Sequence, residues 1–281
     1  MRSLHRFAEP ADFLARAQLF LRAAEAENVL MLGLCDPGGS RRFDGSCYLA
    51  TVEEDQAVVA CALRTPPHGA LLTRADRQAL ELLVADLAGT YPDLPAAAGP
   101  EPAIKDFAQS WSARTGTTAR LAMRMRVFEA RRVVQPALPS GMFRAATEAD
   151  LPTATQWVEA FFAEVNLDDP SDPRKVAREQ IIEGRLFIWE DSGPVSMAAW
   201  AGRTGRTVRV NSVFTPPRHR GRGYASACVA WLTRRLLNEG LASCCLYTDL
   251  ANPTSNKIYQ AIGYRPVCDA SEHHFGVRVS S

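Results

Sequence analysis

The chain has 281 residues, of which 47% are hydrophobic and 22% charged, and its formal net charge is +1 at pH 7. This composition is typical of a soluble globular protein with one large or two ordinary domains, and it argues against a strongly basic nucleic-acid-binding chain. No apolar run approaches the ~20 residues that cross a bilayer, and the N-terminal residues lack the apolar core of a signal peptide. We therefore expect a cytoplasmic protein that does not bind membranes.

The seven cysteines are scattered, odd in number and without Cys-x-x-Cys spacing, and Cys244 and Cys245 are adjacent within an apolar run. Paired disulfides and structural metal sites need regular spacings that are absent here. We expect free, buried thiols of a reducing compartment and no bound metal.

The first half, residues 1–135, alternates helical and strand-like patterns. A helix at about 10–26 leads to the apolar segment 28–35, and a hairpin at 47–63 turns at Glu54–Asp55. The pattern continues with the segment 69–74, a helix at 75–89, the segment 94–99, a helix at 101–116 and a strand at 119–130.

The segment 131–143 has two prolines, a Ser-Gly pair and no periodicity, and we take it as the boundary to a second domain at 142–281. A strand at 143–146 precedes a helix at 147–165, whose Thr147 and Asp150 resemble a capping box. A second helix at 171–184 has Ser171 or Asp172 as its cap.

A three-stranded meander follows, and the chain then alternates helix and strand to its end. The predicted segments are strands at 185–190, 195–201 and 206–214, a helix at 224–239, a strand at 241–250, a helix at 253–263 and two closing strands at 264–269 and 273–279. The two halves share this order, so we predict a mixed α/β (α+β) fold in two similar domains. Either an ancient duplication or the coincidence of two α/β domains explains that order.

Arginines gather in the second half without acidic neighbours in the sequence. No Asp or Glu occurs between Asp191 and Glu239, whereas eight arginines do. At the centre, "RHRGRGY" (218–224) joins a strand to a helix, and such a turn directs backbone N–H groups and the positive end of a helix dipole at an anion. Gly221 and Gly223 allow close approach of phosphate, although a solvated basic loop is the alternative.

Residues that are missing from the loop restrict which phosphate ligand it could bind. A P-loop needs a lysine that is absent, and a dinucleotide fingerprint needs a third glycine where this chain has Ser226. The corresponding segment of the first half, "LLTRADRQAL", has an aspartate and no glycine. We expect only the second half to bind the anion.

Two motifs together carry a resemblance to a known family. "RHRGRG" fits [R/Q]-x-x-G-x-[G/A], and 29 residues after Gly223 "NPTSNKIYQAIGY" fits N-x-x-[S/A]-x-x-x-Y-x-x-x-G-[Y/F]. Over about 142–281 the chain resembles the GNAT (Gcn5-related N-acetyltransferase) superfamily. The tandem layout with a degenerate first half is similar to a bacterial group of predicted GNAT acetyltransferases.

The resemblance implies that acetyl-CoA is the donor and lies where strand 206–214 separates from strand 241–250. It implies that the backbone of Asn211, Ser212 and Val213 pairs with the pantetheine arm. Asn252 would bond the same arm or only cap the next helix, and Tyr259 would protonate the leaving thiolate or only pack in the core. The pyrophosphate would be held by the loop of Arg218, His219, Arg220, Gly221, Arg222, Gly223 and Tyr224.

The chain departs from the family at the general base. Many members have a glutamate on one of the two separating strands, but the first strand here presents Thr207, Arg209 and Asn211. Asp249 on the second strand is the nearest carboxylate, and it could instead only end that strand. We do not choose a histidine as base, and a relayed water stays open. Further acids, which cap helices or face an acceptor, are Glu159, Glu164, Asp168, Asp169 and Asp172.

We therefore predict an acetyl-CoA-dependent N-acetyltransferase that acts on a small-molecule or peptide amine by direct attack in a ternary complex. The alternative is a non-catalytic acyl-CoA sensor or partner-binding protein. A nucleic-acid partner is disfavoured because interleaved exposed aromatic residues and a basic excess are missing. A homodimer stays open, and the identity of the acceptor cannot be read from the sequence.

Overall fold

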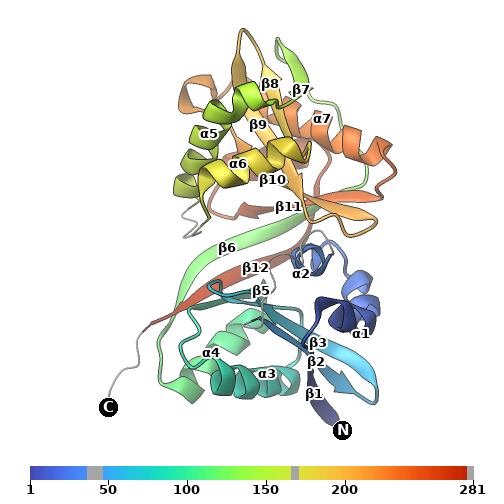
Figure 1. Ribbon diagram of the computed structural model, residues 1–281, viewed down its shortest axis with the longest axis vertical. Coiled ribbons are helices and arrows are strands. Elements are labelled where there is room, and N and C mark those ends of the chain that lie inside the picture. Colours follow the sequence, from blue (N-terminus) through green and yellow to red (C-terminus); the bar gives the residue numbers. More distant parts are fainter. Residues whose placement is uncertain (37–46, 166–170, 277–281) are drawn as a thin grey trace. The chain divides into compact units, whose positions relative to one another are not determined.

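The computed structural model describes residues 1–36, 47–165 and 171–276 (Figure 1). The chain forms two compact units, unit 1 with Met1–Val127 and Val267–Ser281, and unit 2 with Phe128–Pro266. Both combine helices with a mixed sheet, so the predicted α/β class is confirmed.

The two halves of the chain repeat one order of elements: strand, two helices, three strands, helix, strand, helix, strand. In the first half these are β1 (Arg2–Arg6), α1 (Pro10–Ala23), α2 (Val29–Cys35), β2 (Tyr48–Glu54), β3 (Ala57–Arg64), β4 (Ala70–Leu72), α3 (Arg77–Thr90), β5 (Ala96–Pro100), α4 (Ala103–Thr115) and β6 (Ala119–Ala130). In the second half they are β7 (Met142–Ala145), α5 (Leu151–Glu164), α6 (Pro173–Ile182), β8 (Leu186–Glu190), β9 (Pro194–Ala201), β10 (Thr207–Phe214), α7 (Tyr224–Asn238), β11 (Ser243–Asp249), α8 (Pro253–Ala261) and β12 (Arg265–Phe275).

In unit 1 the strand order is β1-β2-β3-β4-β5-β12-β6. Strands β1 to β4 pair antiparallel with one another, and β4 and β5 are parallel. One face packs against α3 and α4 through residues such as Leu80 and Phe107, and the other packs against α1 and α2 through Phe13 and Leu32. Helices on both faces explain why β2 is buried along almost its whole length.

In unit 2 the order is β11-β10-β9-β8-β7, again antiparallel except for the parallel pair β10–β11. Alternate residues point to opposite faces of a strand, so this sheet also has two cores. The α5–α6 face holds Ile188, Met197 and Phe214. The α7–α8 face holds Val208 and Val210 and also receives Phe128 and Ala130 from the end of β6.

The helix starts follow from their capping residues. Thr147 and Asp150 make both hydrogen bonds of the predicted capping box before α5. Of the two candidate caps for α6, the carboxylate of Asp172 accepts from the N–H of Arg174, 2.9 Å away. These short polar side chains satisfy first-turn N–H groups that have no partner inside the helix.

The two predicted closing strands are wrong, because residues 265–275 form the single strand β12. Its register with β5 runs without a break from Ala270 opposite Pro100 to His274 opposite Ala96. Of the residues between the two predicted strands, Ala270 to Glu272, only Ser271 is of a type that favours a turn. The apolar segment 28–35, which we left unassigned, contains helix α2.

The predicted domains, 1–135 and 142–281, differ from the compact units at the last strand. Residues from Val267 onward belong to unit 1, where β12 pairs with β5. Each unit therefore includes the final strand of the other half of the chain, at least in part. We keep the division into 1–135 and 142–281 as a proposal about the two copies of the repeat.

Candidate functional site

Strands β10 and β11 of unit 2 pair over only part of their length. The parallel register joins Thr207 through Arg209 to Ser243 through Cys245, while β10 continues to Phe214 and β11 to Asp249. Beyond Arg209, the β11-facing edge of β10 is therefore not part of the sheet ladder. The predicted separation of these two strands is present in the structure.

A β-bulge lies on β10 at this point. Asn211 is opposite Ala199 and Phe214 is opposite Met197, so two residues of β10 lie where β9 has one. Ser212 adopts a left-handed conformation with φ of 48°, which is uncommon for a residue with a side chain. Asn211, Ser212 and Val213 thus combine an unpaired strand edge with an irregular backbone, at the place where we predicted backbone pairing with a ligand.

The glycine loop follows β10 and ends at the start of α7. Gly221 and Gly223 have φ values of 76° and 83°, and a Cβ at Gly221 would meet nothing within 4 Å. Gly223 is the residue before the helix and has no side chain to cap it, and the first turn of α7 has no acidic residue. The first N–H groups of α7 are therefore left for an external acceptor, and the helix dipole favours an anionic one.

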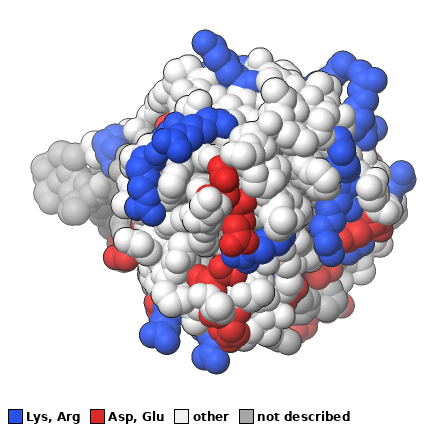
Figure 2. Space-filling model, turned by 90° about the horizontal axis from the view of Figure 1, so that it is seen from above, with Lys and Arg blue, Asp and Glu red and all other residues white. Residues whose placement is uncertain are grey.

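The arginines of this loop have more acidic neighbours than the sequence suggests. Arg220 donates to the carbonyl of Thr215 over 2.8 Å and pairs with the Glu164 carboxylate of α5. Arg235 pairs with Glu239 over 3.0 Å. The stretch between Asp191 and Glu239 has no acidic residue in the sequence, but the fold gives these two arginines acidic partners from α5 and from the end of the stretch. Figure 2 likewise shows basic and acidic side chains beside one another on the face it views.

Asp191 anchors the start of α7. Its carboxylate accepts hydrogen bonds from Tyr224 Oη over 2.5 Å and from Ser140 Oγ over 2.6 Å. These bonds, that from Ser140 first, lower the pKa of Asp191. Desolvation and the charges of Arg218 and Arg222 lower the pKa of His219, which favours its neutral form.

Tyr259 lies on α8 in the core of the α7–α8 face and is 8% exposed. Its ring meets that of Tyr264 edge-on at 6.0 Å between centroids. Burial raises the pKa of Tyr259 to about 12. The hydroxyl is therefore protonated at neutral pH, as a proton donor must be.

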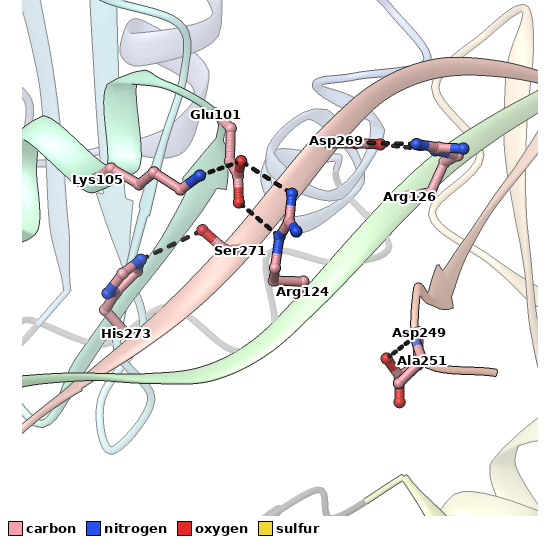
Figure 3. Close-up of polar contacts among 9 residues, drawn as sticks. All are labelled: Glu101, Lys105, Arg124, Arg126, Asp249, Ala251, Asp269, Ser271 and His273. Carbon is pink, nitrogen blue, oxygen red and sulfur yellow. Dashed lines mark hydrogen bonds and ion pairs between the residues drawn. The ribbon is translucent and has the colours of Figure 1, made fainter.

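Asn252 and Asp249 both form the turn between β11 and α8. The side chain of Asn252 accepts from the N–H of Ser255 over 3.0 Å, which makes it the cap of α8. Asp249 Oδ1 accepts from the N–H of Ala251 over 2.8 Å (Figure 3). The structural roles that we left open for both residues are present, and each is compatible with ligand contact.

The remaining candidates are dispersed. Glu159 is exposed on α5, Glu164 pairs with Arg220 and Asp172 caps α6. Asp168 and Asp169 lie outside the described residues. His273, one of the histidines that we did not choose as base, belongs to unit 1, and its Nε2 lies 3.3 Å from Ser271 Oγ (Figure 3).

The corresponding helix of unit 1, α3, begins differently. Asp76 caps it by accepting from the N–H of Ala79 over 3.0 Å and also pairs with Arg2. The preceding Arg74 is bound to the Glu27 carboxylate at 2.6 Å. A carboxylate already occupies this helix start, so it opposes a second anion.

Sequence reasoning missed Gln180 on α6. It is 4% exposed, and its Nε2 donates to Ser212 Oγ over 3.3 Å. Gln180 Oε1 and Asn211 Oδ1 are both buried without a hydrogen-bond partner among the described residues. A glutamine inside an amphipathic helix gives no sequence signal for this contact, because the contact depends on the bulge in β10.

Three further features of the described residues concern metal sites, disulfides and membrane-spanning helices. Within residues 1–36, 47–165 and 171–276, no group of three or more His, Cys, Asp or Glu side chains is placed to hold a metal ion. The seven cysteines all lie among the described residues and form no disulfide with one another, as predicted, and five of them are buried. No helix in the described part of the chain has the length and apolar character needed to span a bilayer.

Comparison with known proteins identifies the fold. Residues 188–273 match the family model described as FR47-like protein. An acetyltransferase from the GNAT family of Colwellia psychrerythraea is 12% identical with a TM-score of 0.58, over 98% of this chain and 100% of that one. A GCN5-related N-acetyltransferase from Sphaerobacter thermophilus is 16% identical with a TM-score of 0.62, over 97% and 95%. A tandem GNAT protein from the clavulanic acid biosynthesis pathway is 14% identical with a TM-score of 0.55, over 100% of both chains.

Proposed function

We propose that unit 2 of this chain, whose fold is similar to that of GNAT acetyltransferases, transfers the acetyl group of acetyl-CoA to an amine. One observation carries the choice of donor. The start of α7, behind Gly221 and Gly223, has no side-chain cap and follows the strand whose pairing with β11 stops at Arg209. An anionic pyrophosphate at the helix start and an extended amide chain along the free strand edge fit this combination.

The residues divide the binding of acetyl-CoA between them. The backbone of Asn211, Ser212 and Val213 pairs with the pantetheine amides. The loop from Arg218 to Tyr224, including His219, Arg220, Gly221, Arg222 and Gly223, surrounds the pyrophosphate. Asn252 contacts the pantetheine arm while it caps α8.

The reaction is a direct attack in a ternary complex. The neutral amine nitrogen attacks the thioester carbonyl carbon, so a C–N bond forms and the C–S bond breaks. Tyr259 gives its hydroxyl proton to the leaving sulfur. The proton that the amine loses passes to Asp249 or to water, and the phenolate is reprotonated from solvent before the next turnover.

Tyr259 carries the proton that this step requires. With a pKa of about 12 the hydroxyl stays protonated through the physiological pH range, so it is available to the leaving sulfur.

A second candidate function is a non-catalytic acyl-CoA sensor, because the chain offers few groups that could act as general base. One oxygen of Asp249 already accepts a hydrogen bond from the N–H of Ala251, and β10 has no carboxylate where it separates from β11. A sensor would bind acetyl-CoA as tightly but would release free CoA no faster with an amine than without one.

Steady-state release of CoA, measured together with acetylated product by mass spectrometry over a panel of primary amines, tests the proposal. Continuous, amine-dependent release with matching product is expected. Binding of acetyl-CoA without amine-dependent release from any member of the panel would favour the sensor.

A further inference from the structure

Two amide oxygens on the α5–α6 face of unit 2 are buried and have no hydrogen-bond partner in the described part of the chain. Gln180 uses its Nε2 to hold Ser212 Oγ at 3.3 Å, while its Oε1 has no hydrogen-bond partner among the described residues. Asn211 Oδ1, from the residue before Ser212, is also buried and also has no hydrogen-bond partner among the described residues. Native proteins satisfy the great majority of buried polar groups, so two such acceptors at one bulge indicate a missing donor.

The backbone explains why these oxygens share one side of the sheet. Asn211 is opposite Ala199, which belongs to the core under α5 and α6. The bulge adds a residue, so Ser212 also faces α6 and contacts Gln180, whereas Val213 packs on the opposite core. The two acceptors therefore lie beside the unpaired part of β10, on the side away from α7 and α8.

Both acceptors are neutral, although charged groups occur on the elements around them. The adjoining residues of β9 that face α5 and α6, Met197 and Ala199, carry no charge. The titratable or charged residues of the packed elements are Arg209 on β10, Cys244, Cys245, Tyr247 and Asp249 on β11, Glu159 and Glu164 on α5, and Arg174, Lys175, Arg178 and Glu179 on α6.

Building on the proposed acetyl transfer, we propose that Asn211 Oδ1 and Gln180 Oε1 bind the N–H groups of the attacking amine and thereby select weakly basic amines. An amide oxygen accepts a hydrogen bond from a neutral amine but, unlike a carboxylate, supplies no negative charge to hold an ammonium ion. Of the side chains proposed to meet the amine, only Asp249, which can take the proton lost after the attack, carries a negative charge. The amine then enters in its neutral form, its first proton having gone to bulk water, and it attacks the thioester as described above.

The ratio of the acetylation rates of weakly and strongly basic amines can be predicted from their pKa values. At pH 7.5 roughly a third of an α-amine with a pKa near 7.8 is neutral, against about one in a thousand of a lysine ε-amine with a pKa near 10.4. The greater intrinsic nucleophilicity of the more basic amine offsets part of this difference. We expect the α-amine to be acetylated at least about tenfold faster.

A competition within one molecule tests the inference. The full chain is given acetyl-CoA and the dipeptide amide Ala-Lys-NH2, which has one α-amine and one ε-amine, and the two acetylated isomers are separated and counted by mass spectrometry. The wild type should favour the α-product. Asn211→Asp places a carboxylate at the bulge and should shift the product ratio toward the ε-amine by about tenfold or more.

Two further variants keep this test decisive. Gln180→Glu introduces the same charge from α6 and should shift the ratio in the same direction, should Asn211→Asp fail to fold. Asn238→Asp, at the exposed end of α7, adds the charge far from the bulge and should leave the ratio unchanged. A ratio that favours the ε-amine in the wild type, or that neither bulge variant changes, overturns the inference while the transfer activity stands. No acetylated product from any amine overturns the proposed function and this inference with it.

Discussion

The hydroxyl of Tyr259 is the group whose removal distinguishes a catalytic acetyltransferase from a protein that only binds acetyl-CoA. Tyr259→Phe removes one oxygen and keeps the ring that packs on Tyr264, so α8 should hold its place. If the hydroxyl protonates the leaving sulfur, kcat should fall by about 10²–10⁴, the usual range for a general acid, and toward the lower end because a thiolate leaves tolerably without a proton. Binding of acetyl-CoA, measured by calorimetry, should stay near the wild-type value.

The pH profile provides the control for Tyr259. Burial raises its pKa above the ordinary value of a tyrosine, so the acid form persists as pH rises and is lost only as pH approaches about 12. The wild-type kcat should therefore show no alkaline decline from Tyr259 below about pH 11. An unchanged kcat in Tyr259→Phe across the pH range would leave the proposed reaction without its acid.

Gly221 tests the anion site by charge. Gly221→Asp puts a carboxylate at the helix start where the pyrophosphate is proposed to lie, and nothing within 4 Å of the new Cβ obstructs it. The affinity for CoA should fall at least about a hundredfold, or about 3 kcal/mol. Gly116→Asp in unit 1 is the control. Gly116 has almost the same φ as Gly221, 73° against 76°, and equally open space for a Cβ, so the control variant introduces the same charge and a similar backbone strain. Equal affinities in the two variants would exclude this loop as the anion site.

At the scale of elements, the ion pair between α5 and the glycine loop restrains Arg220. Glu164 and Arg220 are each about half exposed, and an exposed pair contributes at most about 1 kcal/mol. If Arg220 turns to the pyrophosphate on binding, Glu164→Gln should raise the affinity for CoA by about two- to fivefold. Glu159→Gln, on the exposed side of the same helix, should have little effect, and a loss of affinity in Glu164→Gln would show that the pair itself holds the loop in its binding form.

Most elements are predictable from local patterns. The hairpin β2–β3, the capping box before α5, the proline at the start of α6 and the strand β6 all have local sequence signals, and all lie within a few residues of their predicted ranges. Strand β12 was split because a gap in the apolar pattern resembles a turn. Its continuity comes from pairing with β5, about 170 residues earlier in the chain, which no local pattern encodes.

The candidate site also combines features that the local sequence predicts with features that depend on tertiary contacts. The loop of Gly221 and Gly223 and the motif of Asn252 and Tyr259 are local, so the sequence alone points to them. The contacts of Arg220 with Glu164, and of Gln180 with Ser212, join residues from separate elements. Such contacts depend on the bulge and on helix placement, so sequence reasoning overestimated the free positive charge and missed the amides.

At the scale of the whole molecule, the two halves share one order of elements but differ in how their central helices begin. In unit 2 the start of α7 is uncapped behind two glycines, whereas in unit 1 the Asp76 carboxylate caps α3 and Arg74 is bound to Glu27. Because β12 belongs to the sheet of unit 1, a fragment ending at residue 135 would lack a strand of that unit. Binding should therefore be measured on the full chain.

The central claim, that acetyl-CoA is held by unit 2 and not by unit 1, is tested most directly by calorimetric titration of the full chain with acetyl-CoA. We expect one molecule bound per chain, with that single binding event weakened at least about a hundredfold by Gly221→Asp. Two molecules bound per chain, or one that binds undiminished in Gly221→Asp, would contradict the claim.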